Sequence, residues 1–565
     1  MLFSPFKSTH VGMLRERLGA FRQRSYRLLV AHYSADNRST VMTNEFPKKS
    51  ITQDLAERYQ QYLTGKTPQP SDAPIRRPDL NKVAIVGAGM SGLYSALLLK
   101  KQGIDVKIFE ATDRVGGRVY THRFEDKKNQ YFEAGAMRLP QVDWQKPVFD
   151  LIRYLNNTLP HFPINLIPYN YSYTSGNRVY VNNTKQKDEN IMTVDYANHH
   201  LDELGFPTAA GANEEAGKLL QDAINPIAKE LLDDFPSALK KYDCKTLHFY
   251  LSTELGWTPE KINYVEVMTS QTNEFYLGLV DQVILNSDFT GQVVSEWQTI
   301  DDGMCRLPEA MTMVIGEKSI IYNTPIESLR YIANDRVEVG YSVSDLGVKY
   351  ENFDAVVLAL PPSSVRMIRN KPTWPVALEH GLRSIHFQPL YKIGLRFKSR
   401  FWERENLRPS NGGQSISDLP CRWVVYPSYG IGDKGMGVLL LYSWMTDSNH
   451  WLPKSNLEKV NLALSNLQEL YPEVDIYDQY AGGSPGNENY LKEAFPVEWA
   501  VQWALGDATF YPSQFSYLYP VMKQPQRQIY FTGEHLSVYH TWIVGALDSA
   551  KDTVCQLLGH NVGHL

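Results

Sequence analysis

The chain has 565 residues, of which 43% are hydrophobic, and domains usually hold about 100 to 200 residues, so two or three lobes are expected. Its formal net charge of −5 excludes the basic surplus that nucleic-acid binding normally requires and favours a soluble enzyme with small-molecule ligands. The four cysteines are far apart without C-x-x-C spacing, which argues against both a disulfide framework and a zinc site.

The first 41 residues contain six arginines but only two acidic residues, and they lack the continuous apolar core of a secretory signal. Three interpretations stay open: an Arg-rich targeting or pro-segment, a helical extension that packs on the body, and an upstream extension with Met42 as the start. We favour the second, because amphipathic helices usually pack. The compartment, cytoplasm or export, stays open. Residues 83–99 are uncharged but glycine-containing, so no transmembrane segment is predicted.

A proline-rich linker is expected at residues 64–80, and the first domain begins directly after it. A strand at 82–86, a glycine turn, a helix at 91–102 and a strand at 105–109 follow one another. This βαβ order predicts a parallel sheet.

Residues 190–285 are predicted to form a helical insertion, because apolar residues recur there at helical spacing and β-branched runs are few. Strand patterns return over residues 318–360 and 386–450. The pattern indicates an α/β fold class, α+β overall.

Gly87, Gly89 and Gly92 follow the first strand and open the helix. The first glycine makes the tight turn, the second lets the backbone approach a pyrophosphate, and the third lets the helix pack on the strand. The pyrophosphate is expected at the helix N-terminus. Glu110, at the end of the second strand, is placed to accept hydrogen bonds from ribose hydroxyls. A tight turn without a ligand is the alternative, but strand, helix and acid together predict a dinucleotide site.

Residues 114–118, Arg-Val-Gly-Gly-Arg, resemble the second glycine motif of FAD-binding amine oxidases rather than the continuation of a nicotinamide dehydrogenase. The resemblance implies FAD instead of NAD, with Arg118 supplying a cation near the diphosphate. Taken alone, the segment is also consistent with a plain surface turn.

Arg138 lies among small and apolar residues in the segment 132–140, and a planar guanidinium is suited to bidentate binding of a carboxylate. The segment resembles that of L-amino-acid oxidases, in which an arginine fixes the substrate α-carboxylate. Monoamine and polyamine oxidases have no carboxylate to bind. The alternative is a structural salt bridge between Arg138 and a core acid.

Two strand segments extend the resemblance. Residues 421–427 place Tyr426 at the same carboxylate, although an ordinary strand aromatic is the alternative. Residues 392–397, followed by a Phe-Trp pair, resemble the strand whose lysine holds a water against the flavin N5. This implies that Lys392 stabilises negative charge as oxygen is reduced.

The C-terminal segment 529–546 resembles the family segment where a glutamate binds the flavin ribityl chain and an aromatic residue stands beside the substrate. Glu534 and Trp542 match these positions, and Thr541 replaces the family's usual small residue. Core packing is the alternative for Trp542, as for Trp503, which is a candidate for a further aromatic wall.

The resemblance, from about residue 81 to 550, implies a Rossmann-like FAD-binding domain of the glutathione-reductase type, a mixed-sheet substrate domain and a helical insertion. The expected segments are an N-terminal extension and linker (1–80), the FAD-binding domain (81–130, 298–385 and 521–565), the substrate domain (131–190 and 386–520) and the helical domain (191–297).

The residues expected to bind FAD are Gly87, Gly89, Gly92, Glu110, Arg118, Ala136, Met137, Arg138, Ile326, Glu534 and Ile543. Those expected to act in catalysis are Lys392, Arg138, Tyr426 and Trp542. No metal is expected. Because no cysteine lies close to the C-terminal flavin segment, the FAD is expected to be non-covalent.

The implied reaction is oxidative deamination of an L-amino acid by O2 to a 2-oxo acid, ammonia and hydrogen peroxide, with hydride transfer from the α-carbon. No partner beyond the amino acid and O2 is implied, and a homodimer stays open. The alternatives are an oxidase of amines without a carboxylate, an amino-acid 2-monooxygenase that forms an amide, and a non-catalytic flavoprotein platform. The preferred side chain stays open, because the helical region has no readable motif.

Overall fold

The computed structural model describes residues 50–64, 80–125, 127–171, 176–184, 192–207, 215–287, 296–343, 347–501 and 504–565. The interpretations of the first 41 residues, most of the predicted linker and Trp503 therefore lie outside the described residues. Among the described helices, none combines the length and apolar character needed to cross a membrane.

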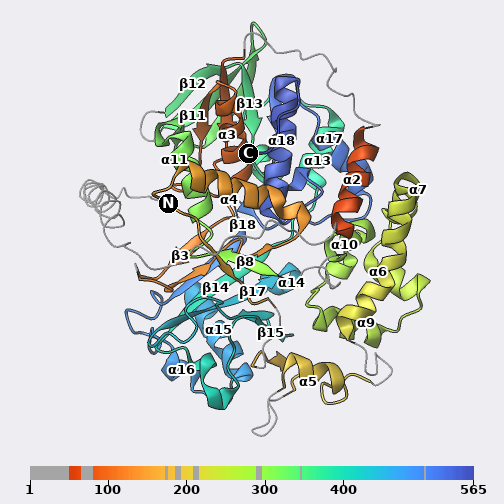
Figure 1. The fold of residues 1–565 in the computed structure, drawn as a ribbon, viewed down its shortest axis with the longest axis vertical. Helices are drawn as coiled ribbons and strands as arrows, with labels where there is room; N and C mark the ends of the chain where they lie inside the picture. Colours follow the sequence, from red (N-terminus) through yellow and green to blue (C-terminus); the bar gives the residue numbers. More distant parts are fainter. Residues whose placement is uncertain are drawn as a thin grey trace, which may run out of the picture. The chain divides into compact units, whose positions relative to one another are not determined.

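A five-stranded sheet with only parallel pairs forms the upper part of Figure 1. Its strands, in spatial order, are β20 (Ile529–Phe531), β13 (Ala355–Leu358), β1 (Lys82–Val86), β2 (Asp105–Phe109) and β9 (Ile320–Ile321). The predicted βαβ unit is confirmed, since β1 pairs in parallel with both β2 and β13. The strands come from the three segments expected to form the FAD-binding domain, whose boundaries stay a prediction.

The helix after β1 is α3 (Met90–Lys101), and its residues 90–99 are all buried. A helix that is apolar on all sides needs cover on all sides, and α3 packs against α18 (Ile543–Leu558) and α11 (Arg306–Ile315) as well as against the sheet. Figure 1 shows α3 and α18 side by side next to β13. An antiparallel sheet of β10 (Ile326–Ile332), β11 (Arg336–Val343) and β12 (Gly347–Phe353) connects β9 to β13.

A seven-stranded mixed sheet forms the second half of the molecule. Its order is β19 (Ala504–Leu505), β18 (Ala494–Val501), β14 (Leu390–Phe397), β17 (Gly437–Trp444), β16 (Trp423–Val425), β15 (Gln414–Ser417) and β7 (Val179–Tyr180). Side chains alternate along β14, so Ile393 and Leu395 enter a core shared with α15 (Asn456–Leu470). Lys392 therefore points to the opposite face of the sheet.

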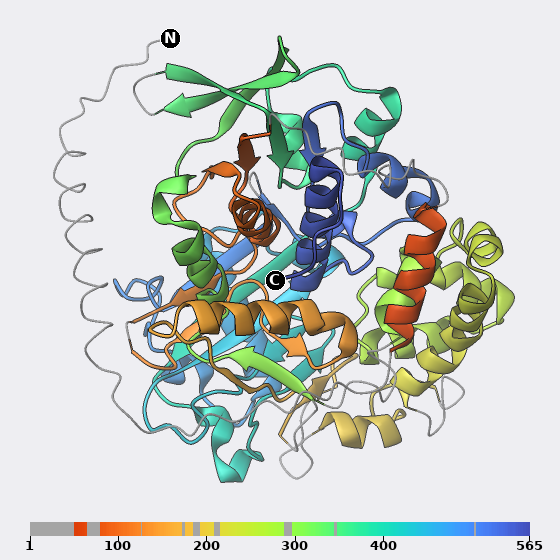
Figure 2. The same cartoon turned by 45° about the horizontal axis from the view of Figure 1, so that its top comes forward.

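The predicted helical insertion is present, with α5 (Val194–His199), α6 (Ala216–Asp233), α7 (Phe235–Tyr242), α9 (Pro259–Met268) and α10 (Leu279–Asn286). Figure 2 shows α2 (Ile51–Thr64), in red, beside these helices. The Tyr59 ring of α2 lies 5.4 Å from that of Phe235, and the Tyr59 hydroxyl donates to the Phe515 carbonyl at 2.7 Å. This part of the expected extension therefore packs into the core.

Short elements connect the two large sheets. They are β3 (Thr121–Arg123), β4 (Tyr131–Glu133), β5 (Leu139–Pro140), α4 (Lys146–Thr158), β6 (Leu166–Pro168) and β8 (Trp297–Ile300). The other α-helices of the described residues are α8 (Leu247–Phe249), α12 (Pro362–Met367), α13 (Val376–Ser384), α14 (Met445–Asn449), α16 (Ile476–Gln479) and α17 (Tyr519–Met522). Because Leu139 pairs with Gln298, Arg138 lies beside β8.

Candidate active site

A cavity of about 480 Å³ begins at the carboxyl ends of β1 and β2 and extends to residues of the seven-stranded sheet. Ligands of open parallel sheets bind at the carboxyl ends of the strands. At the other end the cavity is lined by Lys392 of β14 and Tyr442 of β17, which are directly paired in the sheet. One continuous space therefore connects the glycine turn to the predicted catalytic lysine.

The glycine turn has the shape that a diphosphate requires. A Cβ on Gly87 would lie 2.6 Å from the Ala359 carbonyl oxygen, and one on Gly92 would lie 2.0 Å from that of Gly87. A Cβ on Gly89 would meet nothing within 4 Å, and Gly89 lines the cavity as the N-cap of α3 without a side-chain cap. Unpaired N–H groups at this helix N-terminus favour an anion. Gly92, in contrast, packs helix on strand and does not line the cavity.

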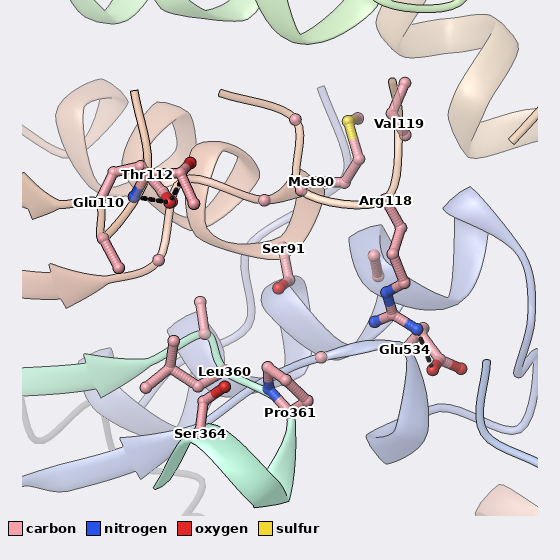
Figure 3. Close-up of a pocket in the computed structure, with 18 of the residues that line it drawn as sticks. Met90, Ser91, Glu110, Thr112, Arg118, Val119, Leu360, Pro361, Ser364 and Glu534 are labelled. Atoms are coloured by element: carbon pink, nitrogen blue, oxygen red, sulfur yellow. Dashed lines mark hydrogen bonds and ion pairs between the residues drawn. The ribbon is translucent and has the colours of Figure 1, made fainter. Parts of the chain in front are cut away.

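Glu110 is fixed at the cavity wall, as Figure 3 shows. One carboxylate oxygen accepts a hydrogen bond from the Ala88 backbone N–H at 2.7 Å, and the other accepts from the Thr112 backbone N–H at 2.9 Å and from its hydroxyl at 2.8 Å. The side chain is buried. Its carboxylate thus holds the glycine turn and faces the space where a ribose would lie.

Arg118 and Glu534 form an ion pair of 2.8 Å at the cavity (Figure 3). The Glu534 carboxylate also accepts from the backbone N–H groups of Ala508 and Thr541, each at 3.0 Å. Burial acts to raise the pKa of Glu534, but Arg118 and two nearby histidines outweigh it and hold the pKa below its usual range. Arg118 and Glu534, which are expected to contact separate parts of the cofactor, are therefore joined by an ion pair.

Arg138 lies in an aromatic cage, defined as Tyr171, Trp297 and Trp423. Its guanidinium carbon is 4.7 Å from the centre of the Tyr171 ring and 5.5 Å from each tryptophan ring. Among the described residues no carboxylate forms an ion pair with it, and its Nη1 is buried without a hydrogen-bond acceptor. Among the described residues, Arg138 therefore has no acidic partner for the structural salt bridge that was the alternative.

The aromatic cage is next to the cavity without forming part of its wall. Ala136, two residues before Arg138, lines the cavity, and so does Trp542, whose ring lies 6.3 Å from that of Trp297. Trp542 also makes an edge-on contact of 5.5 Å with Trp144. A substrate held by Arg138 would therefore meet Trp542 on its way to the cavity.

The predicted role of Tyr426 stays a prediction, but in this structure its side chain faces away from Arg138. Its hydroxyl is fully buried and bonded to the Ser415 hydroxyl at 2.7 Å and to the Tyr471 hydroxyl at 2.5 Å. It belongs to the core beneath α15, on the face of the sheet opposite to Arg138. Strand alternation explains the difference, because Trp423, three residues earlier on β16, is the side chain that faces the guanidinium.

Lys392 is buried, and its Nζ donates to the carbonyl oxygens of Gly135 at 2.6 Å and Glu133 at 3.2 Å. It lies 4.5 Å from the centre of the Tyr442 ring. Burial lowers the pKa of Lys392 to about 7, with Glu133 opposing the shift and Arg138 adding to it. The lysine thus ties the segment before Arg138 to the wall of the cavity.

Ile326 and Ile543 line the cavity, whereas Met137 does not; its sulfur lies 3.8 Å from the Lys392 Nζ. Thr541 has φ +67°, in the left-handed region where a β-branched side chain is strained. A small residue would relax this turn, which accounts for the family's usual residue at this position; nothing in the structure explains why Thr541 stands here instead.

Tyr442, Trp499 and Asp507 are among the lining residues that were not predicted. The Trp499 indole N–H donates to the Ala134 carbonyl at 2.7 Å, so this tryptophan provides the aromatic wall for which Trp503 was a candidate. Tyr442 could have been found from its pairing with Lys392, had the strand register been known.

Replacing Glu110 by Ala is expected to weaken FAD binding about 10- to 100-fold, since two hydrogen bonds to a charged acceptor are worth about 1.5 to 3 kcal/mol each and the turn relaxes in part. Titration of the apoprotein with FAD, followed by flavin fluorescence, measures the change. The exposed Glu317→Gln is the matched control. Unchanged affinity in the Glu110 variant would remove this residue from the cofactor site.

A dinucleotide cleft whose far wall carries a buried lysine and aromatic rings defines a cofactor-dependent oxidoreductase. Residues 90–558 match the family model of flavin containing amine oxidoreductases. The chain therefore belongs to this family, and a flavin-containing family implies FAD.

The chain is 30% identical over 525 residues to a putative bifunctional amine oxidase of Dictyostelium discoideum, covering 84% of this chain but 46% of that longer protein. It is 28% identical over 487 residues to a putative L-amino-acid oxidase of Bacillus subtilis, covering 83% of this chain and 92% of the relative. The fold is similar to that of the cyclohexylamine oxidase from Brevibacterium oxydans, with a TM-score of 0.62, 17% identity and coverage of 85% and 99%. The family and the mixed α/β fold are thereby confirmed.

Proposed function

We propose that this protein is an L-amino-acid oxidase that binds FAD non-covalently and converts an L-amino acid to a 2-oxo acid, ammonia and hydrogen peroxide. The observation that carries the proposal is Arg138, a cation without an acidic partner among the described residues, held by aromatic rings beside the cavity. A substrate carboxylate would complete the bidentate pair that the guanidinium lacks. An oxidase of simple amines has no use for this group.

The cavity residues fit FAD. The turn at Gly87 and Gly89 would hold the diphosphate, Glu110 the adenosine ribose, and the Arg118–Glu534 pair the chain between diphosphate and ring. When bound, FAD supplies the acceptor for a hydride and the route of two electrons to O2. None of the described residues that line the cavity is a cysteine, which supports the non-covalent proposal.

The protein's own part in the reaction is positioning. Arg138 would fix the carboxylate, and Trp542 with Trp297 would limit the directions in which the α-carbon can point. Water is excluded by the aromatic walls, which strengthens the charge pair. A separate general base is unnecessary if the substrate amine enters deprotonated.

Anaerobic mixing of the purified protein with a panel of L-amino acids should bleach its flavin absorbance, and under air each active substrate should yield peroxide and a 2-oxo acid. The matched amines without the carboxylate form the control panel. Bleaching by the amines alone would favour an amine oxidase, an amide product would indicate a 2-monooxygenase, and no bleaching at all would leave a flavoprotein platform.

A further inference from the structure

Asp507 is an acidic residue in the wall of the cavity, at the end that contains Lys392 and Trp542. One of its carboxylate oxygens accepts from the Gln388 side-chain N–H at 3.0 Å. Among the described residues no cation forms an ion pair with it. Arg118 lowers the pKa of Asp507 but is already paired with Glu534, and the charge of Asp507 also acts on Lys392, whose Nζ is held by backbone carbonyls. The net effect of burial and of Glu534 is to raise the pKa of Asp507 to about 6.

A second, independent feature lies beside this carboxylate. The Gln388 side chain is only 5% exposed, and after it donates to Asp507 its own carbonyl oxygen is left buried without a donor. A buried acceptor without a partner costs about 1 to 3 kcal/mol. Gln388 itself does not line the cavity, so its buried amide fixes the orientation of the Asp507 carboxylate in the cavity wall.

Glu274, in the short helix η4 (Glu274–Tyr276), is a second buried acidic side chain whose titration is influenced by Asp507. It is buried, no ion pair within the described residues includes it, and after burial the charge of Asp507 is the largest influence that raises its pKa, to about 8. Two acidic side chains from different lobes thus influence one another, and no cation of the described residues forms an ion pair with either of them. Buried carboxylates without a cation are costly, and a ligand that brings a cation with several N–H donors removes this cost.

We propose that Asp507, held in place by Gln388, forms the subsite for the substrate side chain and selects an L-amino acid that ends in an ammonium or guanidinium group. This inference rests on the proposed function, because it assumes that Arg138 holds the carboxylate of the same molecule. The carboxylate would then be bound at the arginine in the aromatic cage and the side-chain cation at Asp507, with Trp542 between the two walls. A side chain of equal length without the terminal cation leaves Asp507 unsatisfied.

The test replaces Asp507 by Asn, which keeps the shape and removes the charge. Turnover of L-lysine is compared with that of L-norleucine, which has the same carbon chain without the ammonium. We expect the ratio of kcat/KM for lysine over norleucine to fall roughly a hundredfold or more, because one partner of a desolvated charge pair is lost. The exposed Asp105→Asn, with the same change in net charge, should leave the ratio unaltered.

A binding measurement separates recognition from chemistry. 6-Aminohexanoate and hexanoate match lysine and norleucine without the α-amine, so neither can be oxidised at the α-carbon. Calorimetry should show that Asp507→Asn weakens 6-aminohexanoate roughly a hundredfold and leaves hexanoate unchanged. Equal weakening of both ligands, or reduced FAD content in the variant, would overturn the subsite and assign Asp507 to structure or cofactor binding.

The outcome also separates this inference from the proposed function. If L-amino acids are oxidised but norleucine is preferred and Asp507→Asn changes nothing, the subsite is wrong and the oxidase stands. If diamines are oxidised in an Asp507-dependent way and no L-amino acid bleaches the flavin, the proposed oxidase of amino acids fails, while recognition of a cation by Asp507 is retained.

Discussion

Replacing Arg138 by Met is expected to lower kcat/KM for an L-amino acid by about 10²- to 10³-fold or more. Leaving a substrate carboxylate unpaired in a desolvated site costs about 2 to 5 kcal/mol. Misplacement of the α-hydrogen adds to this loss, because the same contact orients the substrate. Met keeps the length and apolar character of the side chain, so the aromatic cage stays filled. Steady-state kinetics on purified wild type and variant measure the effect.

The matched control is the amine that lacks the carboxylate of the same substrate, which should lose nothing in the variant. Two proteins and two substrates form a double-mutant cycle with the substrate as one partner. The exposed Arg330→Met serves as the protein control. Equal loss on both substrates would mean that Arg138 is structural, and the amino-acid assignment would lose its main support.

Features encoded by neighbouring residues could be predicted from the sequence. Gly87 has a φ of +100°, which favours glycine, and Gly92 contacts the turn that precedes it. The spacing of these glycines therefore predicts the turn, although the distant Ala359 carbonyl also crowds Gly87. The position of Glu110 could be predicted from the same βαβ unit, since its carboxylate accepts a hydrogen bond from the Ala88 backbone N–H at the ends of adjacent strands. Local geometry of this kind repeats wherever a βαβ unit binds a dinucleotide.

Features that depend on distant pairing could not be predicted. Tyr426 and Trp423 are three residues apart, and only the placement of β16 between β15 and β17 decides which of them faces Arg138. One step in strand register exchanges the two faces. Asp507 gives no signal by itself, because its importance arises from Gln388, 119 positions earlier. The packing of α2 could not be predicted for the same reason, because its partner Phe515 lies far away in the sequence.

We expect Lys392 to act on the oxygen half of the proposed reaction. It is a buried cation at the cavity wall, and its Nζ is held by two backbone carbonyls rather than by a carboxylate, so its charge is only partly compensated. A preorganised cation in a site without water stabilises negative charge far better than solvent does. Substrate oxidation would require no such charge, because the proposed function places the carboxylate at Arg138.

Replacing Lys392 by Met should therefore slow the reaction of the reduced enzyme with O2 by roughly 10²- to 10³-fold, while reduction by substrate changes little. Stopped-flow measurement of the two half-reactions resolves them, and the exposed Lys398→Met is the matched control. Burial lowers the pKa of Lys392 to about 7, so the ammonium loses its proton as the pH rises through that value. The rate with O2 in the wild type should accordingly decline between about pH 6 and pH 8, and in the Met variant this decline should be absent. Equal slowing of both half-reactions would instead assign Lys392 to holding the segment that carries Arg138, because its bonds to Glu133 and Gly135 would then be its whole contribution.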